Sequence, residues 1–539
     1  MQRRLMVAGL LCLSPGAGLA QATPPRVAAD GETFEGTYFG SPNNAVFKGI
    51  PYAAPPVGEL RWQPPRRHAV HPGVQSALAA GASCFQSDRL TAWTKGIAAV
   101  FGTQDKVEVH PLNASEDCLF LNVWTTLWNR RSAPAPVMVW IHGGSNLNGE
   151  GSTPWYDGAA LARRGVIVVT INYRLGPFGF LSHPALTAES PNHASGNYGL
   201  LDQLEALRWV QRNISAFGGD PSRVTVFGES AGAIDIMHLM ASPLSKGLFQ
   251  RAIAESGAPM QGMMGLAGAE AVGVKLAGAL GIEPGTGALA ALRARPASDI
   301  LTAAGRLLLA GQFAPSPIVD GWVLTGVTGQ VFDEGRQLPV PLLIGSNALE
   351  MTSLQFYLPR VEHTPEAYRR WLEQTTGPAA PRMAEWYPAP SGAEVEGAVV
   401  KLITNSFFTC PSRMAARSVS HTGRPAYLYQ FTRVLPGGEK LGAYHSAEIA
   451  YVFGNWMAWL PHEAVDDKLS DTMGRYWTQF AGSGNPNGGG LPEWPAYTAK
   501  TDQHLELGSQ VRVGTGLLRE PCDVFDPGLR AQWQTGGTG

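Results

Sequence analysis

Four apolar runs limit the fold of this 539-residue chain more than any other feature. Each run is apolar almost throughout, which is typical of strands covered on both faces. The four runs lie at 137–141, 166–171, 224–227 and 340–344. Between the second and third runs, leucine and valine recur at helical spacing over residues 200–210, with Asn197 as a candidate N-cap. This alternation predicts an α/β fold, a mostly parallel sheet with helices on both faces.

Two later segments, near 260–310 and near 355–405, are richer in helix signals than in strand signals. We expect them to be helical insertions that cover one end of the sheet. The chain is 44% hydrophobic and only 16% charged, which is enough for a large buried core. We therefore predict that residues 21–539 form a single α/β domain.

Residues 1–20 predict a secretory signal peptide. Arg3 and Arg4 precede an apolar stretch from Leu5 to Leu13, and a small-residue cleavage site ends at Ala20. The apolar stretch is too short to span a bilayer, and no other run approaches that length. We expect a secreted or periplasmic protein without stable membrane insertion.

Four cysteines remain after the predicted cleavage: Cys84, Cys118, Cys410 and Cys522. An even number in an exported protein predicts two disulfides, and spacing alone leaves all three pairings open. No zinc motif such as C-x-x-C or H-E-x-x-H is present, so we expect no metal and no cofactor. The net charge of −2 and the absence of a basic stripe argue against a nucleic-acid partner.

Ser230 lies in the sequence GESAG, directly after an apolar run and before a segment that can continue as helix. This strand–turn–helix context is the one that a nucleophile elbow requires. Small neighbours allow the sharp turn, and the helix N-terminus favours a developing negative charge. A glycine-flanked turn serine is the ordinary alternative, so the assignment depends on partners elsewhere in the chain.

Three further segments supply those partners. Gly143 and Gly144 follow a strand and let backbone N–H groups approach a carbonyl oxygen. Glu350 follows another strand, and His445 lies in a later loop. The order serine, acid, histidine is the order that this sheet topology uses.

Taken together, these motifs identify the chain as a member of the type-B carboxylesterase family of α/β-hydrolases. The resemblance covers most of the mature chain. It rests on FKGIPYAAPPVGELRW, SEDCLFLNVW, INYRLGPFGFL, GNYGLLDQLEALRWVQRNISAFGGDP, VFGESAGA, GSNALE and YHSAEIAYVFGN. The C-terminal YWTQFAGSGNPN is similar as well.

The resemblance implies a role for each matching residue. Ser230 is the expected nucleophile, His445 the base and Glu350 the orienting acid. Other roles are implied as follows: oxyanion-hole N–H groups of Gly144, Ser145 and Ala231; Glu229 beside the nucleophile; Ser256 and Glu448 as partners of the histidine; disulfides Cys84–Cys118 and Cys410–Cys522; ion pairs Arg61–Glu116 and Arg174–Asp202. His142 is expected to hold the glycine loop rather than to move protons.

Ser145 and Asn146 depart from the family pattern, which has Gly or Ala and then an aromatic residue at these places. We expect Asn146 to line the substrate pocket and the pair to affect which acyl groups are accepted. The tryptophan motif of choline-binding members is missing, so cholinesterase specificity is not predicted. The predicted function is hydrolysis of small-molecule carboxylic esters through an acyl-enzyme. The alternatives are the same mechanism on amides, lactones or polyesters, or a non-catalytic binding protein.

Overall fold

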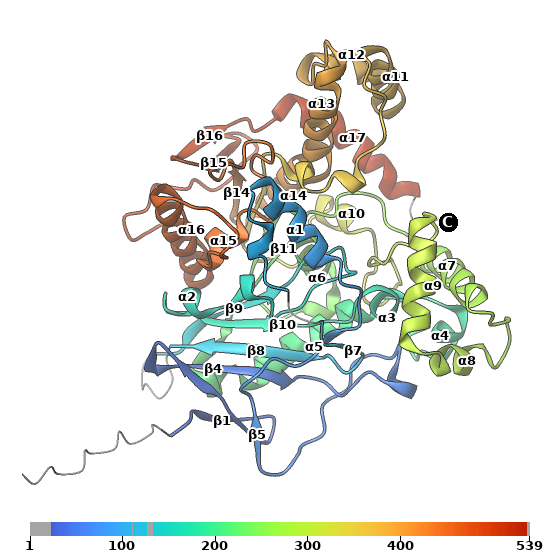
Figure 1. Cartoon of the computed structure of the whole chain (residues 1–539), viewed down its shortest axis with the longest axis vertical. Helices are drawn as coiled ribbons and strands as arrows, with labels where there is room; N and C mark the ends of the chain where they lie inside the picture. The colour runs from blue at the N-terminus through green and yellow to red at the C-terminus, as the bar shows by residue number, and fades with distance from the viewer. Residues whose placement is uncertain (1–22, 110–111, 127–132, 536–539) are drawn as a thin grey trace, which may run out of the picture.

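The computed structural model describes residues 23–109, 112–126 and 133–535 of the chain. The predicted signal peptide lies outside these residues. A large mixed sheet runs through the middle of the molecule, with helices on both of its faces (Figure 1). Two small sheets accompany it, β1–β2–β5 (Arg26–Ala29, Glu32–Glu35, Val74–Ser76) and β6–β7 (Ser83–Cys84, Ala114–Ser115).

The large sheet has eleven strands in the part of the chain that the structure describes. In order across the sheet they are β16 (Val511–Thr515), β15 (Gln503–Leu507), β14 (Ala426–Phe431), β13 (Leu342–Asn347), β12 (Arg251–Glu255), β11 (Gly219–Glu229), β9 (Ala135–Ile141), β10 (Ile167–Ile171), β8 (Phe120–Thr125), β4 (Ser41–Pro51) and β3 (Thr37–Phe39). Neighbours from β15 to β10 pair in parallel, whereas both ends of the sheet are antiparallel.

The parallel centre of the sheet confirms the α/β prediction. The four apolar runs form most of β9 and all of β10, the middle of β11 and the first part of β13, and within these strands they are buried. Helices α5 (Tyr198–Asn213), α6 (Ala231–Ala241) and α16 (Ala464–Ser483) contribute large buried faces. Because parallel strands end at a common edge, the segments after β9, β11 and β13 meet there.

Asn197 does not cap α5 with its side chain, contrary to the prediction. Its amide instead donates to the carbonyl oxygen of Ile318 and accepts from the Ile318 N–H, both at 3.0 Å. A distant segment that passes alongside the helix start therefore takes the hydrogen bonds that a local cap would use.

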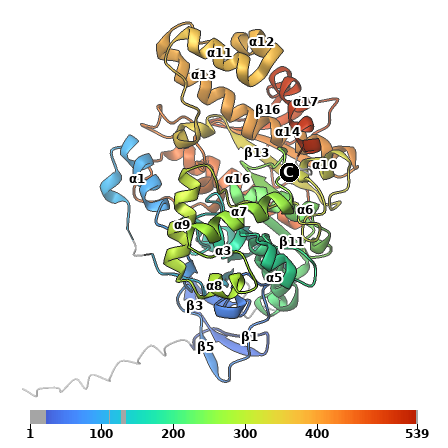
Figure 2. The same ribbon diagram turned by 90° about the vertical axis from the view of Figure 1, so that its right-hand side faces the viewer.

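Helical segments lie beyond the sheet at two places (Figure 2). The first carries α7 (Leu266–Ala279), α8 (Ala288–Ala294) and α9 (Ala297–Leu309), and the second carries α11 (Pro365–Thr376), α12 (Ala380–Trp386) and α13 (Gly392–Thr404). The other α-helices are α1 (Leu90–Val100), α2 (Ala159–Ala162), α3 (Gly176–Phe180), α4 (Pro184–Glu189), α10 (Thr328–Asp333), α14 (Cys410–His421), α15 (Ile449–Phe453) and α17 (Arg519–Thr535). Among the described residues, none of the helices combines the length and apolar character needed to cross a membrane.

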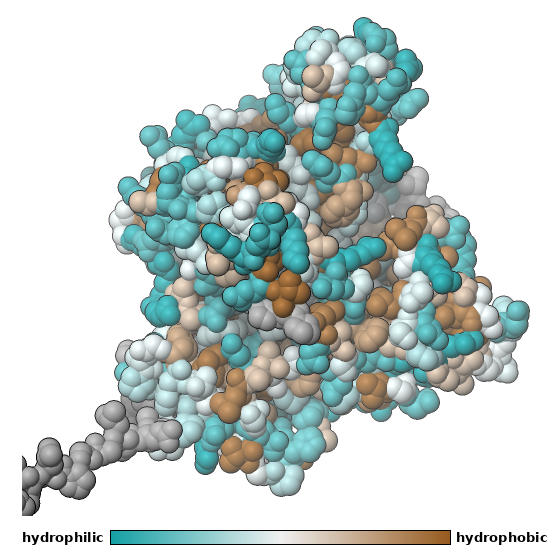
Figure 3. Space-filling model, viewed as in Figure 1, coloured by the Kyte–Doolittle hydropathy of each residue, from teal (hydrophilic) through white to brown (hydrophobic). Residues whose placement is uncertain are grey.

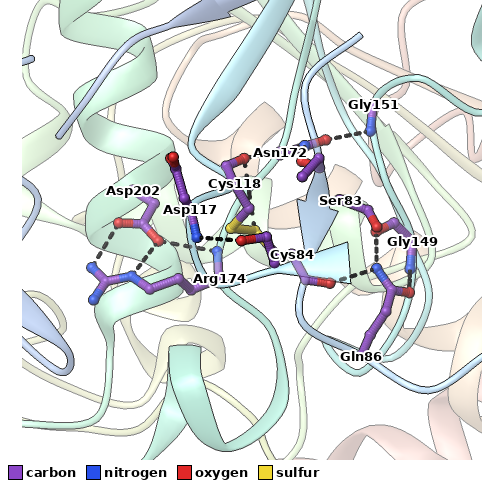
Figure 4. The surroundings of a disulfide bond; sticks show 12 residues. Ser83, Cys84, Gln86, Asp117, Cys118, Gly149, Gly151, Asn172, Arg174 and Asp202 are labelled. Carbon is purple, nitrogen blue, oxygen red and sulfur yellow. Dashed lines mark hydrogen bonds and ion pairs between the residues drawn. A yellow bond between two sulfur atoms is a disulfide. The ribbon is translucent and has the colours of Figure 1, made fainter. Parts of the chain in front are cut away.

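Two disulfides are present. Cys84 is joined to Cys118, and Cys410 to Cys522, so of the three possible pairings the structure has the one that the resemblance implied. Figure 4 shows Cys84–Cys118 near a buried ion pair in which the Arg174 guanidinium donates two hydrogen bonds to Asp202. The other implied ion pair, Arg61 with Glu116, also forms.

Candidate active site

Ser230 stands at the sharp turn between β11 and α6. Its backbone has φ 55° and ψ −123°, a conformation that is rare for a residue with a side chain. The two glycines of GESAG make room for this turn: a Cβ at Gly228 would lie 2.5 Å from the Ile141 carbonyl oxygen, and a Cβ at Gly232 would overlap it. The strained turn and tight packing are those of a nucleophile elbow.

The loop after β9 lies directly over this turn. A Cβ at Gly143 would be 3.0 Å from the Cβ of Ser230 and 2.8 Å from a carboxylate oxygen of Glu229. Gly144 and Ser145 both have positive φ, at 110° and 57°. Their N–H groups and that of Ala231, the first residue of α6, donate to no other group in the described part of the chain. Three unpaired donors therefore come from the two segments that flank Ser230.

Glu350 and His445 form a buried pair. Glu350 follows β13, and its carboxylate accepts the Asn347 N–H at 2.7 Å through one oxygen. The other oxygen lies 2.7 Å from Nδ1 of His445, which sits in the loop between β14 and α15. With Nδ1 held in this way, Nε2 is the nitrogen that remains for proton transfer.

Glu229 also contacts His445, more closely than the sequence indicated. Its Oε1 lies 3.1 Å from Nε2 of the ring and accepts a 2.7 Å hydrogen bond from Ser446. Burial disfavours the charged ring, but Glu229 and Glu350 together outweigh it and raise the pKa of His445 to about 8. Ser230 Oγ forms no hydrogen bond to any described residue, so Glu229 rather than Ser230 is the partner of Nε2 here.

Ser256 and Glu448 reach the histidine only indirectly. Ser256 Oγ donates to Glu448 at 3.4 Å, and Glu448 accepts from the Asn347 side chain. Asn347 in turn donates its backbone N–H to Glu350. Burial raises the pKa of Glu448 well above its ordinary value, although the hydrogen bond from Asn347 lowers it. Asn347, which the sequence reasoning passed over within GSNALE, is thus the link between these residues and the acid.

Buried partners hold both polar atoms of the Asn146 side chain. Its side chain is buried, donates to Asp235 at 3.2 Å and accepts from the Tyr173 hydroxyl at 3.0 Å. Gln203 donates to the other oxygen of Asp235 at 2.6 Å. Burial raises the pKa of Asp235 to about 7, although both amides lower it. Asn146 therefore anchors the glycine loop to α6 from behind.

Ser145 is the exposed member of the pair. Its Oγ lies 2.9 Å from the hydroxyl oxygen of Tyr357. The ring of Tyr357 packs against that of Phe356, with 4.4 Å between the two ring centroids. The centroid of the Phe408 ring lies 5.2 Å from that of the His445 imidazole. Phe408 belongs to a π-helical turn, a local irregularity that is frequent at functional sites. No sequence motif had singled out these aromatic residues.

His142 holds the loop, as the sequence indicated. Its Nδ1 lies 2.8 Å from the Gly143 carbonyl oxygen and its ring stacks on Tyr173. Burial lowers its pKa to about 4, which keeps it neutral. Farther along the loop, Gln86 accepts from the Gly149 N–H at 2.7 Å and donates to the Gly149 carbonyl at 2.8 Å (Figure 4). The segment between Cys84 and Cys118 thus fastens the end of the loop that follows β9.

Comparison with known proteins agrees with this geometry. The Carboxylesterase family profile matches residues 24–525. The chain belongs to this family. It is 38% identical over 500 residues to "Fumonisin B1 esterase" of Sphingopyxis macrogoltabida, covering 89% of this chain and 86% of that one. It is also 38% identical over 491 residues to "Para-nitrobenzyl esterase" of Bacillus subtilis (strain 168), covering 88% of this chain and 94% of that one.

Comparison with solved structures supports the same family and its fold. A PNB esterase structure superimposes with a TM-score of 0.79 at 35% identity, covering 93% of this chain and 99% of that one. This carboxylesterase therefore has the α/β-hydrolase fold and is a carboxylic ester hydrolase.

Proposed function

We propose that this carboxylesterase is an exported serine esterase that works through an acyl-enzyme on Ser230. The observation that carries the proposal is the convergence of three elements at one edge of the sheet. These are a strained serine turn, a buried Glu350–His445 pair at 2.7 Å and three unpaired N–H groups. The arrangement matches what acyl transfer requires: a nucleophile, an oriented base and donors for an oxyanion.

In the proposed mechanism, neutral His445 removes the proton of Ser230 through Nε2 as the serine oxygen attacks the ester carbonyl. Glu350 holds Nδ1–H and stabilises the imidazolium that forms. The N–H groups of Gly144, Ser145 and Ala231 receive the carbonyl oxygen as it becomes negative. The alcohol takes the proton from His445 and leaves, and water activated by the same nitrogen releases the acid.

Glu229 adds a step before the attack. While His445 is protonated, its Nε2 is paired with Glu229 and is not a base. Deprotonation of the ring removes this ion pair and frees the Nε2 lone pair for Ser230, the next residue in the chain. The raised pKa of His445 thus determines the fraction of enzyme that is ready to react.

The surroundings favour a small ester with apolar parts. Phe408 packs beside His445, and Phe356 is 68% exposed next to Tyr357. Figure 3 shows apolar surface below the lobe that carries α11–α13 and again beside α9. Two relatives, a fumonisin B1 esterase and a para-nitrobenzyl esterase, are consistent with a non-choline organic ester as substrate. Export is supported by the signal-like residues 1–20 and by the two disulfides.

Ser230→Ala, assayed with a short-chain chromogenic ester, tests the proposal. We expect turnover to fall by about 10⁴-fold or more, because the covalent step is lost. The matched control is Ser298→Ala, an exposed serine on α9, which should retain wild-type turnover. An organophosphonate probe should label the wild type and the control but not Ser230→Ala. Wild-type turnover in Ser230→Ala would refute the assignment.

A further inference from the structure

A second group of ligand-type side chains lies away from the esterase site. Glu32, His68 and His71 each offer one nitrogen or oxygen atom, and these atoms all lie within 4.8 Å of one another. Glu32 comes from β2, and the two histidines come from the segment before β5, in the sequence His-Ala-Val-His. We propose that this cluster is a binding site for a divalent transition-metal ion of the zinc type.

The register of the small sheet explains why the three side chains meet. β5 runs parallel to β2, with Val74 opposite Thr33. His71 stands three residues before Val74, and Glu32 stands one residue before Thr33, so both lie at the same end of the paired strands. The His71 N–H donates to Glu32 Oε1 at 2.6 Å, which fixes the carboxylate against the loop.

The distances fit tetrahedral coordination. Ligand atoms bound to zinc at its usual distances, in a tetrahedron, lie about 3.3 Å apart. Here His68 Nε2 lies 3.1 Å from His71 Nδ1, and His71 Nδ1 lies 3.3 Å from Glu32 Oε1. His68 Nε2 is 4.0 Å from Glu32 Oε2, which a small rotation of the carboxylate or imidazole shortens. The planes of the two imidazole rings are tilted by 49°, so the rings do not stack face to face.

Burial gives the site a closed side and an open side. The Glu32 and His68 side chains are 3% and 20% exposed, whereas that of His71 is 56% exposed. The buried side preorganises two ligands, and the open side leaves a fourth position for water. Nδ1 of His68 is buried and has no partner among the described residues. Asp117 also lies close enough to interact with this ring by charge.

Two imidazoles and one carboxylate select the class of ion. Imidazole nitrogen suits Zn²⁺ and its neighbours, whereas Ca²⁺ and Mg²⁺ prefer sites built wholly of oxygen. The strands β1 and β5 lie at the lower end of both ribbon views, away from β11 and α6 (Figures 1 and 2). Bound metal would therefore tie the loop that carries the two histidines to β2 and stabilise that end of the fold, separately from ester hydrolysis.

The test is Zn²⁺ binding to the full mature protein, purified without a histidine tag and stripped with a chelator. Calorimetric titration should give one site of micromolar or tighter affinity, and Zn²⁺ should raise the unfolding temperature. Co²⁺ should give the strong visible absorption of four-coordinate cobalt. His71→Ala is the first variant, because His71 is exposed and its replacement leaves the backbone hydrogen bond to Glu32 in place.

We expect His71→Ala and His68→Ala each to bind Zn²⁺ at least about tenfold more weakly. The matched control is His421→Ala, an exposed histidine at the end of α14, which should bind as the wild type does. Esterase activity should be unchanged in all three variants, which separates this outcome from any failure of the proposed mechanism. The proposal is overturned if the wild type shows no one-to-one binding, or if His71→Ala binds as tightly as His421→Ala.

Discussion

Replacing Glu229 by glutamine should shift the pH dependence of ester hydrolysis to lower pH. The Glu229 carboxylate lies 3.1 Å from His445 Nε2, and at this distance an effective dielectric constant of about 20 gives an attraction of about 5 kcal/mol. Burial of the ring offsets much of this attraction, Glu350 adds to it, and the pKa of His445 rises from 6.5 to about 8. That rise corresponds to about 2 kcal/mol in favour of the protonated ring.

The sign of the effect follows from the role of the ring. Neutral His445 is the proposed base, so kcat/KM should fall as pH drops below about 8. In Glu229→Gln the glutamine keeps a hydrogen-bonding group near Ser446 but no charge, so the acidic limb should move down by about one pH unit. At pH 6 the variant should retain a fraction of its own plateau activity about tenfold larger than the wild type does.

The assay is kcat/KM for a neutral chromogenic ester from pH 5 to pH 10, each variant normalised to its own plateau. Glu334→Gln, at an exposed glutamate just after α10, is the control and should reproduce the wild-type profile. An acidic limb for Glu229→Gln that superimposes on the wild type, or that moves to higher pH, would refute the reasoning.

Two further substitutions test the packing at Gly232 and the buried carboxyl of Asp235. Gly232→Ala should lower stability by about 1–3 kcal/mol and reduce turnover, because the new Cβ overlaps the Ile141 carbonyl. Thermal melts and kinetics should show little loss for the control Gly278→Ala on α7, where the space around the glycine is open. Asp235→Asn should stabilise the protein relative to the wild type more at pH 8 than at pH 5. Burial raises the pKa of Asp235 to about 7, so wild-type stability falls between roughly pH 4 and pH 7 as the unfolded carboxyl ionises first. Urea unfolding at both pH values should show a difference of up to about 3 kcal/mol, and an equal effect at both would contradict it.

The sheet was largely predictable because strands that are covered on both faces have continuous apolar sequences. The runs at 137–141 and 224–227 form buried central strands, and Ser230 follows the second of them. The proximity of Glu350 and His445 followed from family resemblance and from strand order, since segments after parallel strands meet at one edge. Their 2.7 Å contact depends on the loop after β14, whose course the sequence did not indicate.

The sequence does not indicate the hydrogen bonds of residues whose environment is made by distant segments. Asn197 bonds to the backbone of Ile318 and not to its own helix, and Asn146 donates to Asp235 on α6. In each case a polar side chain next to a glycine loop or a helix start had a local explanation, but a buried partner far along the chain took its hydrogen bonds. Residue type and spacing do not indicate hydrogen-bond partners that are distant in the sequence.

The Cys410–Cys522 disulfide has a consequence for the order of synthesis. It closes a loop of the chain across a sequence separation of 112 residues, and His445 lies inside that loop, whereas Ser230 and Glu350 lie before it. Chains emerge from the ribosome with the N-terminus first. The segment that carries the nucleophile can therefore leave the ribosome long before Cys522 does. The disulfide that closes the loop around His445 can therefore form only after Cys522 has been synthesised, when nearly the whole chain has been made.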